Sequence, residues 1–130
     1  MKKFKKILLI DDDDINNYVT AKFIKKANIG ETADTVLNGS RGLAYLDDCE
    51  KEAKTFPDLI IVDLSMPIMN GEEFLKEYEA TFWKKHQETK LVVITASIRE
   101  EDKIQALSYQ CISGFLSKPI DGDKLKELLV

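Results

Sequence analysis

Five residues that could together handle a phosphoryl group stand at or just after short apolar runs or turns of the sequence. They are three carboxylates, one hydroxyl and one amine, namely Asp11, Asp12, Asp63, Thr95 and Lys118. Three carboxylates brought close together need a positive neighbour to stay ionised, and a hard divalent cation with oxygen ligands is the natural one. Mg²⁺ suits such a site best, because it takes one or two carboxylates together with water and phosphate oxygens. The residue types therefore predict a magnesium site with phosphoryl chemistry.

The amine, the hydroxyl and one carboxylate have complementary roles at such a site. Lys118 can neutralise a phosphoryl oxygen that the metal does not reach, and the hydroxyl of Thr95 can donate to another. A carboxylate in line with a phosphoryl donor is a plausible nucleophile. Asp63 is the candidate, because it ends an apolar run and precedes a loop shaped by Pro67 and Gly71. Gly71 is expected there because glycine adopts backbone angles that other residues resist.

The apolar runs before these residues are typical of strands in a parallel sheet that is buried on both faces. Strands are expected at residues 7–10, 59–62, 91–94 and 113–116, with a weaker one at 33–37. Helical spacing follows each run. Strand then helix, five times over, predicts an α/β fold with a doubly wound parallel sheet and helices on both faces. In such a sheet ligands bind at the carboxyl ends of the strands.

The helices between these strands are expected to bury one apolar face each. Asp13 or Asp14 is the expected N-cap of the first helix. Its apolar face would carry Ile15, Val19, Phe23 and Ala27, with Tyr18 beside them. In the later helices the residues with apolar spacing are Leu43, Ala44, Leu46, Phe74, Leu75, Tyr78, Phe82, Ile104, Ala106, Leu107, Leu125, Leu128 and Leu129.

Length, charge and cysteine usage narrow the class of protein. The 130 residues fit one domain. A net charge of -4 argues against direct contact with nucleic acid, which needs clustered Lys and Arg. No apolar segment approaches the roughly 20 residues that cross a bilayer, and the run at residues 7–10 is too short for export, so a cytoplasmic protein without membrane contact is expected. Cys49 and Cys111 lack metal-type spacing and are expected to be reduced thiols.

Taken in order, the candidate residues resemble the receiver domain of two-component response regulators, the chemotaxis-regulator type of fold. The resemblance covers residues 1–130, with no output domain visible, and it implies a flavodoxin-like five-stranded sheet of strand order 2-1-3-4-5. The matching pieces are Asp11-Asp12, Asp63 with Met66-Pro67 and Asn70-Gly71, Thr95-Ala96, and Lys118-Pro119.

The resemblance implies a role for each site residue. Asp63 would accept a phosphoryl group from a phosphohistidine on a sensor histidine kinase or phosphotransfer protein. Asp12, Asp63 and the backbone carbonyl of Ser65 would bind Mg²⁺ directly, and Asp11 would act through a metal-bound water. Lys118 would contact the phosphoryl group. Catalysis would be limited to the chain's own phosphorylation and dephosphorylation, so the chain is expected to be a signalling domain rather than an enzyme with other substrates.

The resemblance also implies a switch. Thr95 would move toward the phosphoryl group, and Phe115 would turn inward, which would alter the surface offered to a downstream protein. Phe115 stands where the family often has tyrosine, so it offers no hydroxyl to a partner. Ser65 and Ser97 would flank the path of the hydrolytic water and tune the lifetime of the phosphate. A monomer, or a weak dimer that depends on phosphorylation, is expected.

Two other functions compete with this one. A receiver-like scaffold that cannot be phosphorylated is opposed by the intact set of Asp12, Asp63, Thr95 and Lys118. A phosphohydrolase with an aspartyl nucleophile typically carries a second acid two residues later, where this chain has Ser65. The sequence is equally compatible with a single-domain regulator and with a piece of a hybrid kinase or longer regulator.

Overall fold

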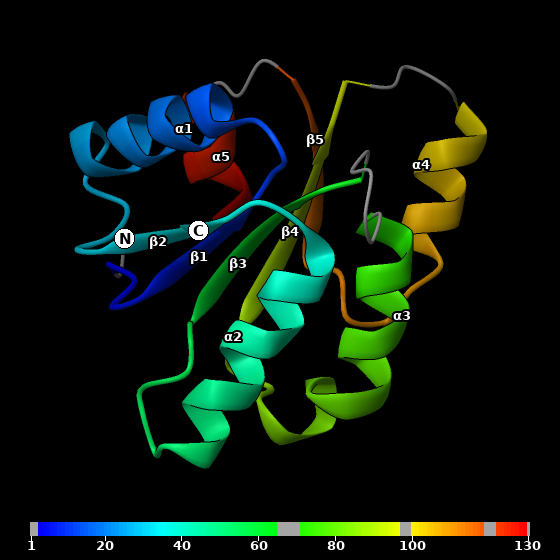
Figure 1. Cartoon of the computed structure of the whole chain (residues 1–130). Helices are drawn as coiled ribbons and strands as arrows, with labels where there is room; N and C mark the ends of the chain where they lie inside the picture. Colours follow the sequence, from blue (N-terminus) through cyan, green and yellow to red (C-terminus); the bar gives the residue numbers. More distant parts are fainter. Residues whose placement is uncertain (1–2, 65–70, 97–99, 119–121, 130) are drawn as a thin grey trace.

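A computed structural model gives the structure of the chain and describes residues 3–64, 71–96, 100–118 and 122–129. Strands and α-helices alternate along these residues, with one short 3-10 helix, η1 (Figure 1). In chain order the elements are β1 (Ile7–Ile10), α1 (Asp14–Lys26), β2 (Ala33–Val36), α2 (Gly39–Lys51), β3 (Leu59–Asp63), α3 (Gly71–Thr81), η1 (Trp83–Lys85), β4 (Lys90–Thr95), α4 (Glu100–Leu107), β5 (Gly114–Ser117) and α5 (Gly122–Leu129).

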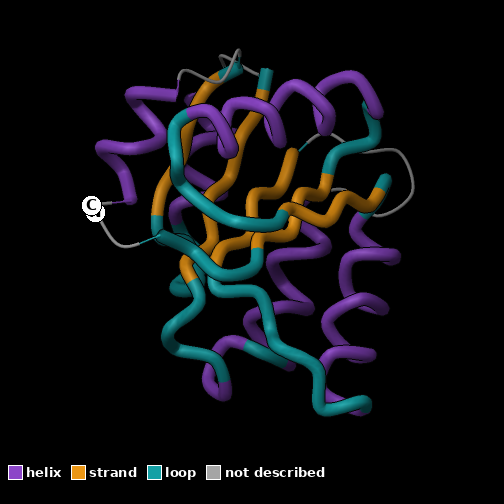
Figure 2. Tube along the Cα trace, turned by 90° about the vertical axis from the view of Figure 1, so that its left-hand side faces the viewer, coloured by secondary structure: helices purple, strands orange, loops and turns teal. Residues whose placement is uncertain are grey.

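The strands form one parallel sheet in the order β2-β1-β3-β4-β5. This confirms the predicted α/β fold with strand order 2-1-3-4-5. Every residue of β1 and β3 is buried, because helices cover both faces of the sheet (Figure 2). β2 lies at one edge, and its two middle residues, Asp34 and Thr35, are exposed. Its weak apolar pattern follows from this position.

Alternate side chains of the strands enter two separate cores. Ile7, Leu9 and Ile61 point toward α1 and α5, where Ile24 and Leu125 meet them. The intervening strand residues point to the opposite face and pack against α2 and α3. This alternation follows from the two-residue period of a strand. Both cores therefore rest on the same three central strands, and the one under α1 and α5 joins the first and last helices of the chain.

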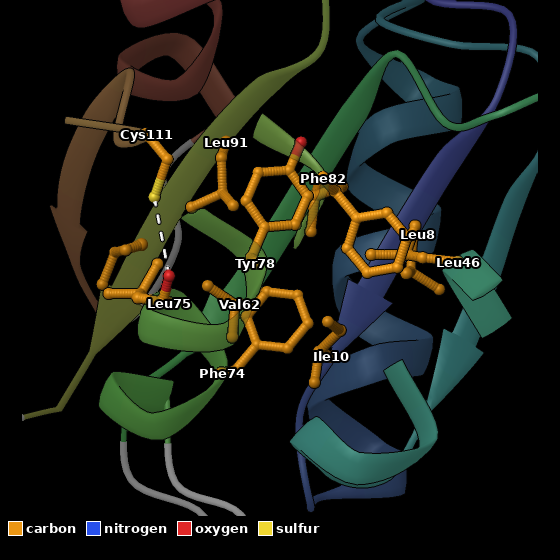
Figure 3. Packing of buried hydrophobic residues seen from close by; sticks show 12 residues of the cluster. Leu8, Ile10, Leu46, Val62, Phe74, Leu75, Tyr78, Phe82, Leu91 and Cys111 are labelled. Atoms are coloured by element: carbon orange, nitrogen blue, oxygen red, sulfur yellow. Dashed lines mark hydrogen bonds between the residues drawn. The ribbon is translucent and has the colours of Figure 1, made fainter. Parts of the chain in front are cut away.

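The core under α2 and α3 contains a row of aromatic side chains among its aliphatic ones (Figure 3). Phe74 and Tyr78 of α3 have ring centroids 5.9 Å apart, and Phe82 follows at 6.0 Å from Tyr78. All three are buried, as is Leu46 of α2. The apolar face predicted for the third helix is confirmed, and so are Leu125 and Leu129 in α5. Ala44 on α2, in contrast, is exposed.

The apolar face predicted for the first helix is wrong at three of its four positions, because Ile15, Val19 and Phe23 point outward, whereas Ala27 packs against the core as predicted. Ile15 is 72% exposed, and Phe23, two turns later, is still 38% exposed. The buried residues of α1 are instead Asn17, Thr20 and Ile24. A four-residue spacing overshoots a helical turn by about 40°, so a row of this kind drifts around the helix. A polar residue suits position 17, because the backbone carbonyls of Asp11 and Val36 face the Asn17 side chain there.

Helix α4 shows the same reversal. Ile104 and Leu107, expected to face the core, are 63% and 50% exposed, whereas Ala106 is buried. α4 lies beside α3 (Figure 1), and its Gln105 donates a hydrogen bond to the carboxylate of Glu72 at the start of α3. A short helix that sits at the margin of the sheet buries only a narrow stripe, and a small residue occupies that stripe here.

Cys49 and Cys111 are free and buried, as expected of reduced thiols. Burial is the main cause that raises the pKa of the Cys111 thiol, to about 12, so this group is protonated at neutral pH. Among the described helices, none combines the length and the apolar character that a bilayer crossing requires.

Candidate functional site

The register of the sheet brings the predicted site residues to one edge. Ile10 pairs with Val62, so Asp11 comes directly beside Asp63 at the ends of β1 and β3. Thr95 ends β4 and pairs with Ser117, so Lys118 follows at the end of β5. The backbone N–H of Lys118 donates to the carbonyl of Thr95 at 2.8 Å, which fixes this last junction.

Lys118 forms a buried bridge between two carboxylates. Its Nζ lies 3.0 Å from Oδ2 of Asp11 and 3.0 Å from Oδ2 of Asp63. Each of the two aspartates is 3% exposed. Two buried carboxylates thus share one ammonium group. Because charge-assisted hydrogen bonds are short and directional, this arrangement fixes the orientation of both carboxylates.

The pKa of Lys118 reflects two opposing effects. Burial by itself lowers the pKa, because it penalises the charged ammonium form. The hydrogen bonds to Asp11 and Asp63, together with the charges of both carboxylates, outweigh burial and hold the pKa of Lys118 above its ordinary value. Lys118 therefore carries its positive charge at neutral pH. One positive charge faces at least two negative ones, so the site retains capacity for a further cation.

The donor set of this edge fits a magnesium ion. Asp11, Asp12 and Asp63 each offer a carboxylate oxygen, and these oxygens lie within 4.8 Å of one another. Asp12 is exposed, whereas the other two are buried, so the cluster opens to solvent on the Asp12 side. All donors are hard oxygens without histidine or thiolate, which is the chemistry that Mg²⁺ prefers. The predicted residues Asp11, Asp12 and Asp63 could hold such an ion together.

A tight turn after β1 presents Asp11 and Asp12 and starts α1. The N–H of Asp13 donates to Oδ1 of Asp11 at 3.0 Å. The Asp13 carboxylate in turn accepts from the N–H groups of Ile15 and Asn16 at 2.9 and 3.3 Å, which makes it the N-cap of α1. Of the two predicted caps, Asp13 is the one observed.

Asn17 belongs to this edge but was not expected there. Its Nδ2 donates to the carbonyl oxygen of Asp11 at 3.0 Å, and the carbonyl oxygen of Val36 lies 3.4 Å away. Asn17 was overlooked because it stands beside the apolar row of α1, which looked like the inward face. The sequence signal for such a residue is a polar side chain near the start of a helix that directly follows a strand. The backbone carbonyls at the strand end need hydrogen-bond donors, and such a side chain can supply them.

The two residues expected to form the switch, Thr95 and Phe115, lie in β4 and β5. The side chain of Thr95 is fully buried at the end of β4. Phe115 in β5 is half-buried, it packs against the core under α3, and Nζ of Lys103 on α4 lies 6.0 Å from its ring centroid. Ser65 and Ser97 lie outside the described residues, as do Met66, Pro67, Asn70 and Pro119.

Glycine is required at position 71 because there is no room for a side chain, and not because the backbone has a positive φ there. Its N–H donates to the carbonyl of Leu64 at 2.9 Å. A Cβ at position 71 would lie 2.5 Å from the carbonyl oxygen of Asp63. Among the described residues no glycine has a positive φ, so the expected need for unusual angles at Gly71 is wrong. The start of α3 instead packs directly on the backbone that carries Asp63.

Gly71→Ala is therefore expected to shift the backbone of Asp63. The backbone of Asp63 cannot move aside as a side chain can. We therefore expect a loss of about 3 kcal/mol of unfolding free energy, which is the upper end of the usual range for substitutions that overpack a core. Urea unfolding measures the loss. Gly30→Ala is the matched control, because the added methyl would meet the flexible Cδ1 end of Ile7. Equal losses in the two variants would contradict this account of Gly71.

A cavity of about 290 Å³ adjoins the acidic edge. Asp11 and Lys118 form its polar end, and Val19 and Phe23 of α1 contribute apolar surface. Residues Asn16, Thr20 and Ile94 complete its lining. The outward apolar row of α1 therefore continues into a cavity that is also lined by Asp11 and Lys118.

His86 lies away from this site. Its Nε2 is 2.6 Å from Oε2 of Glu50, and its ring stacks on Phe56 with centroids 3.5 Å apart. Lys85 binds the other oxygen of Glu50 at 3.0 Å. These contacts connect the segment after α3 to the end of α2. The lone histidine therefore has a structural role at this junction.

Comparison with known proteins identifies the same fold and family. A family model described as the response regulator receiver domain matches residues 7–130. A two component response regulator from Cytophaga hutchinsonii has a crystal structure that superposes with a TM-score of 0.89 at 25% identity, covering 98% of this chain and 96% of that one.

Curated relatives include both long and short proteins. The chain is 33% identical over 127 residues to hybrid signal transduction histidine kinase G of Dictyostelium discoideum, covering 95% of this chain. It is 27% identical over 128 residues to the two-component response regulator ORR41 of Oryza sativa subsp. japonica, covering 98% of this chain and 94% of that protein. The relatives also include five histidine kinases that are far longer, and the chain spans 3% to 14% of their length.

Proposed function

Because the chain belongs to the response regulator receiver domain family, we propose that Asp63 accepts a phosphoryl group from a histidine kinase or phosphotransfer protein in a Mg²⁺-dependent reaction. The observation that carries this proposal is the buried bridge in which Asp11 and Asp63 each lie 3.0 Å from Lys118. Asp12 adds a third carboxylate oxygen within 4.8 Å of theirs. This arrangement combines a nucleophile, a cation for the phosphoryl group and ligands for a metal.

Each residue of the site would have its own role in the reaction. A carboxylate oxygen of Asp63 attacks phosphorus and forms an acyl phosphate, while the bond from phosphorus to the donor nitrogen breaks. Lys118 already touches Asp63, so its ammonium group is placed to neutralise a phosphoryl oxygen. Asp11, Asp12 and the Ser65 carbonyl would hold Mg²⁺ with Asp63, with Asp11 acting through a water. Mg²⁺ would neutralise the charge on the phosphoryl oxygens.

The direct test is the intact mass of the protein after incubation with acetyl phosphate, with and without Mg²⁺. We expect one added phosphoryl group that requires Mg²⁺ and is removed by mild base, as an acyl phosphate would be. Beryllofluoride, a mimic of the phosphoryl group, should bind under the same conditions. The absence of an adduct together with no beryllofluoride binding would favour a scaffold that cannot be phosphorylated.

The outward row of α1, formed by Ile15, Tyr18, Val19 and Phe23, is proposed as the docking surface of the phosphodonor. These four apolar side chains are between 38% and 72% exposed. Val19 and Phe23 also line the cavity that ends at Asp11 and Lys118. A partner that covers this row would therefore bring its own side chains up to the carboxylates. An apolar helical surface is the matching partner chemistry, as a donor histidine on a helix bundle would present.

We expect Ile15→Asp to slow transfer from a phosphorylated histidine phosphotransfer domain about tenfold, which is about 1.4 kcal/mol. A charge in an apolar contact is costly, whereas an acid in the first turn of α1 does not weaken the helix. Labelling by acetyl phosphate should not change. Ile104→Asp on α4 is the matched control, because Ile104 is 63% exposed but lies outside this row. Equal slowing in both variants would argue against docking on α1.

The remaining steps of the proposal concern the output. Phosphorylation would draw Thr95 toward the phosphoryl group and let the half-buried Phe115 turn inward, which would change the surface of α4, β5 and α5 for a downstream protein. Ser65 and Ser97 would tune the lifetime of the phosphate. The 130 residues would act as one cytoplasmic signalling domain, a monomer or a weak phosphorylation-dependent dimer, with no substrate other than its own Asp63.

A further inference from the structure

Asn17 is a polar side chain that α1 buries beneath the ends of β1 and β2. Only 4% of the residue is exposed. Its amide faces two backbone carbonyl oxygens, that of Asp11 at 3.0 Å and that of Val36 at 3.4 Å. Because both neighbours are acceptors, the side of the amide that faces them must be the NH₂ group. Asn17 thereby links one helix to the carboxyl ends of two strands.

The carbonyl that Asn17 holds belongs to the peptide unit between Asp11 and Asp12. A peptide unit is planar, so a restrained oxygen also restrains the Cα atom of Asp12. The side chain of Asp11 is held independently, by Lys118 and by the N–H of Asp13. Asp12 is exposed, so the direction of its carboxylate depends strongly on the backbone from which it projects.

Burial alone does not explain an asparagine at this position. An amide loses its hydration when it is buried, and an apolar side chain of similar size would be buried at lower cost. The hydrogen bond to the Asp11 carbonyl compensates for this loss, and it joins the side chain of Asn17 to the backbone of the acidic turn. A residue that only filled space would have no need of that contact.

We propose that Asn17 is a positioning residue for the acidic turn: its hydrogen bond to the Asp11 carbonyl sets the direction of Asp12 and thereby the affinity of the cluster for Mg²⁺. The inference rests on the function proposed above, because it concerns the metal that this function requires. Residues that orient metal ligands without touching the metal typically change its affinity about 10- to 100-fold when they are replaced.

The test is a titration of the full chain with MgCl₂, followed by the NMR amide signals of the acidic turn. We expect Asn17→Leu to bind Mg²⁺ at least about tenfold more weakly than the wild type. Ile24→Val is the matched control, because Ile24 is buried on the same helix but packs in the core under α1 and α5. It should lower Tm and leave Mg²⁺ affinity unchanged, which separates positioning from general loss of stability.

The outcomes distinguish this inference from the proposed function. A wild type that binds Mg²⁺ and an Asn17→Leu variant with the same affinity would overturn the role of Asn17 and leave the proposed function standing. A wild type that binds no Mg²⁺ would overturn both. Should Asn17→Leu fail to fold, Asn17→Ala removes the same hydrogen bonds without added volume. The rise in Tm that Mg²⁺ produces should then be smaller in Asn17→Ala than in the wild type.

Discussion

An Asp63→Asn variant incubated with Mg²⁺ and acetyl phosphate is expected to gain no phosphoryl group. The amide has nearly the shape of the carboxylate but lacks its nucleophilic oxygen. The variant should fold at least as stably as the wild type, because it removes one of two buried carboxylates that share Lys118. Intact-protein mass measures the adduct, and thermal unfolding measures the stability.

Asp47→Asn provides the matched control for this experiment. It makes the same chemical change on the exposed face of α2, where Asp47 pairs with Lys51 in the neighbouring turn. This variant should be labelled like the wild type. Mg²⁺-dependent labelling that persisted in Asp63→Asn would place the acceptor at another residue, and peptide mapping would then locate it.

Lys118→Met is expected to destabilise the metal-free protein by about 3 kcal/mol, the lower end for removing one partner of a buried ion pair. Methionine keeps the length of the side chain but leaves Asp11 and Asp63 without their shared ammonium group. Mg²⁺ should restore part of the lost stability, since it supplies positive charge to the same carboxylates. Urea unfolding with and without Mg²⁺ measures both effects.

Two further variants make the Lys118 prediction specific. Adding Asp63→Asn to Lys118→Met should recover stability, because only one buried carboxylate then lacks a cation. Lys51→Met should cost little, because the ion pair of Lys51 with Asp47 is exposed and screened by solvent. A Lys118→Met protein as stable as the wild type, or one whose loss the second substitution deepens, would contradict the charge balance described for this site.

The strand ends explain why most of the site could be predicted from sequence. β1, β3 and β4 are continuous apolar runs, so the residue at which each run stops is visible without any structure. In a parallel sheet the carboxyl ends of the strands, where these apolar runs stop, all lie at one edge. For this reason Asp11, Asp63, Thr95 and Lys118 were expected together, and the register places them there.

The helix faces could not be predicted in the same way. α1 carries more apolar residues than its inward stripe can bury, and the sequence alone does not say which row is covered. The row of Ile15, Val19 and Phe23 faces outward, while polar Asn17 and Thr20 face the sheet. Which row of α1 faces the sheet depends on the backbone carbonyls at the ends of β1 and β2. These carbonyls need hydrogen-bond donors from the helix that packs on them.

The sequence by itself therefore determined the alternation of strands and helices, and through it the gathering of acids and a lysine at one edge. Only the tertiary structure decided how these groups are held: the shared contact of Lys118, the carbonyl bound by Asn17, and the close approach of Gly71 to Asp63. The physical reason is the distance along the chain over which each feature is determined. Apolar periodicity is a local property of the chain, whereas hydrogen bonds between residues of different elements exist only after those elements have packed.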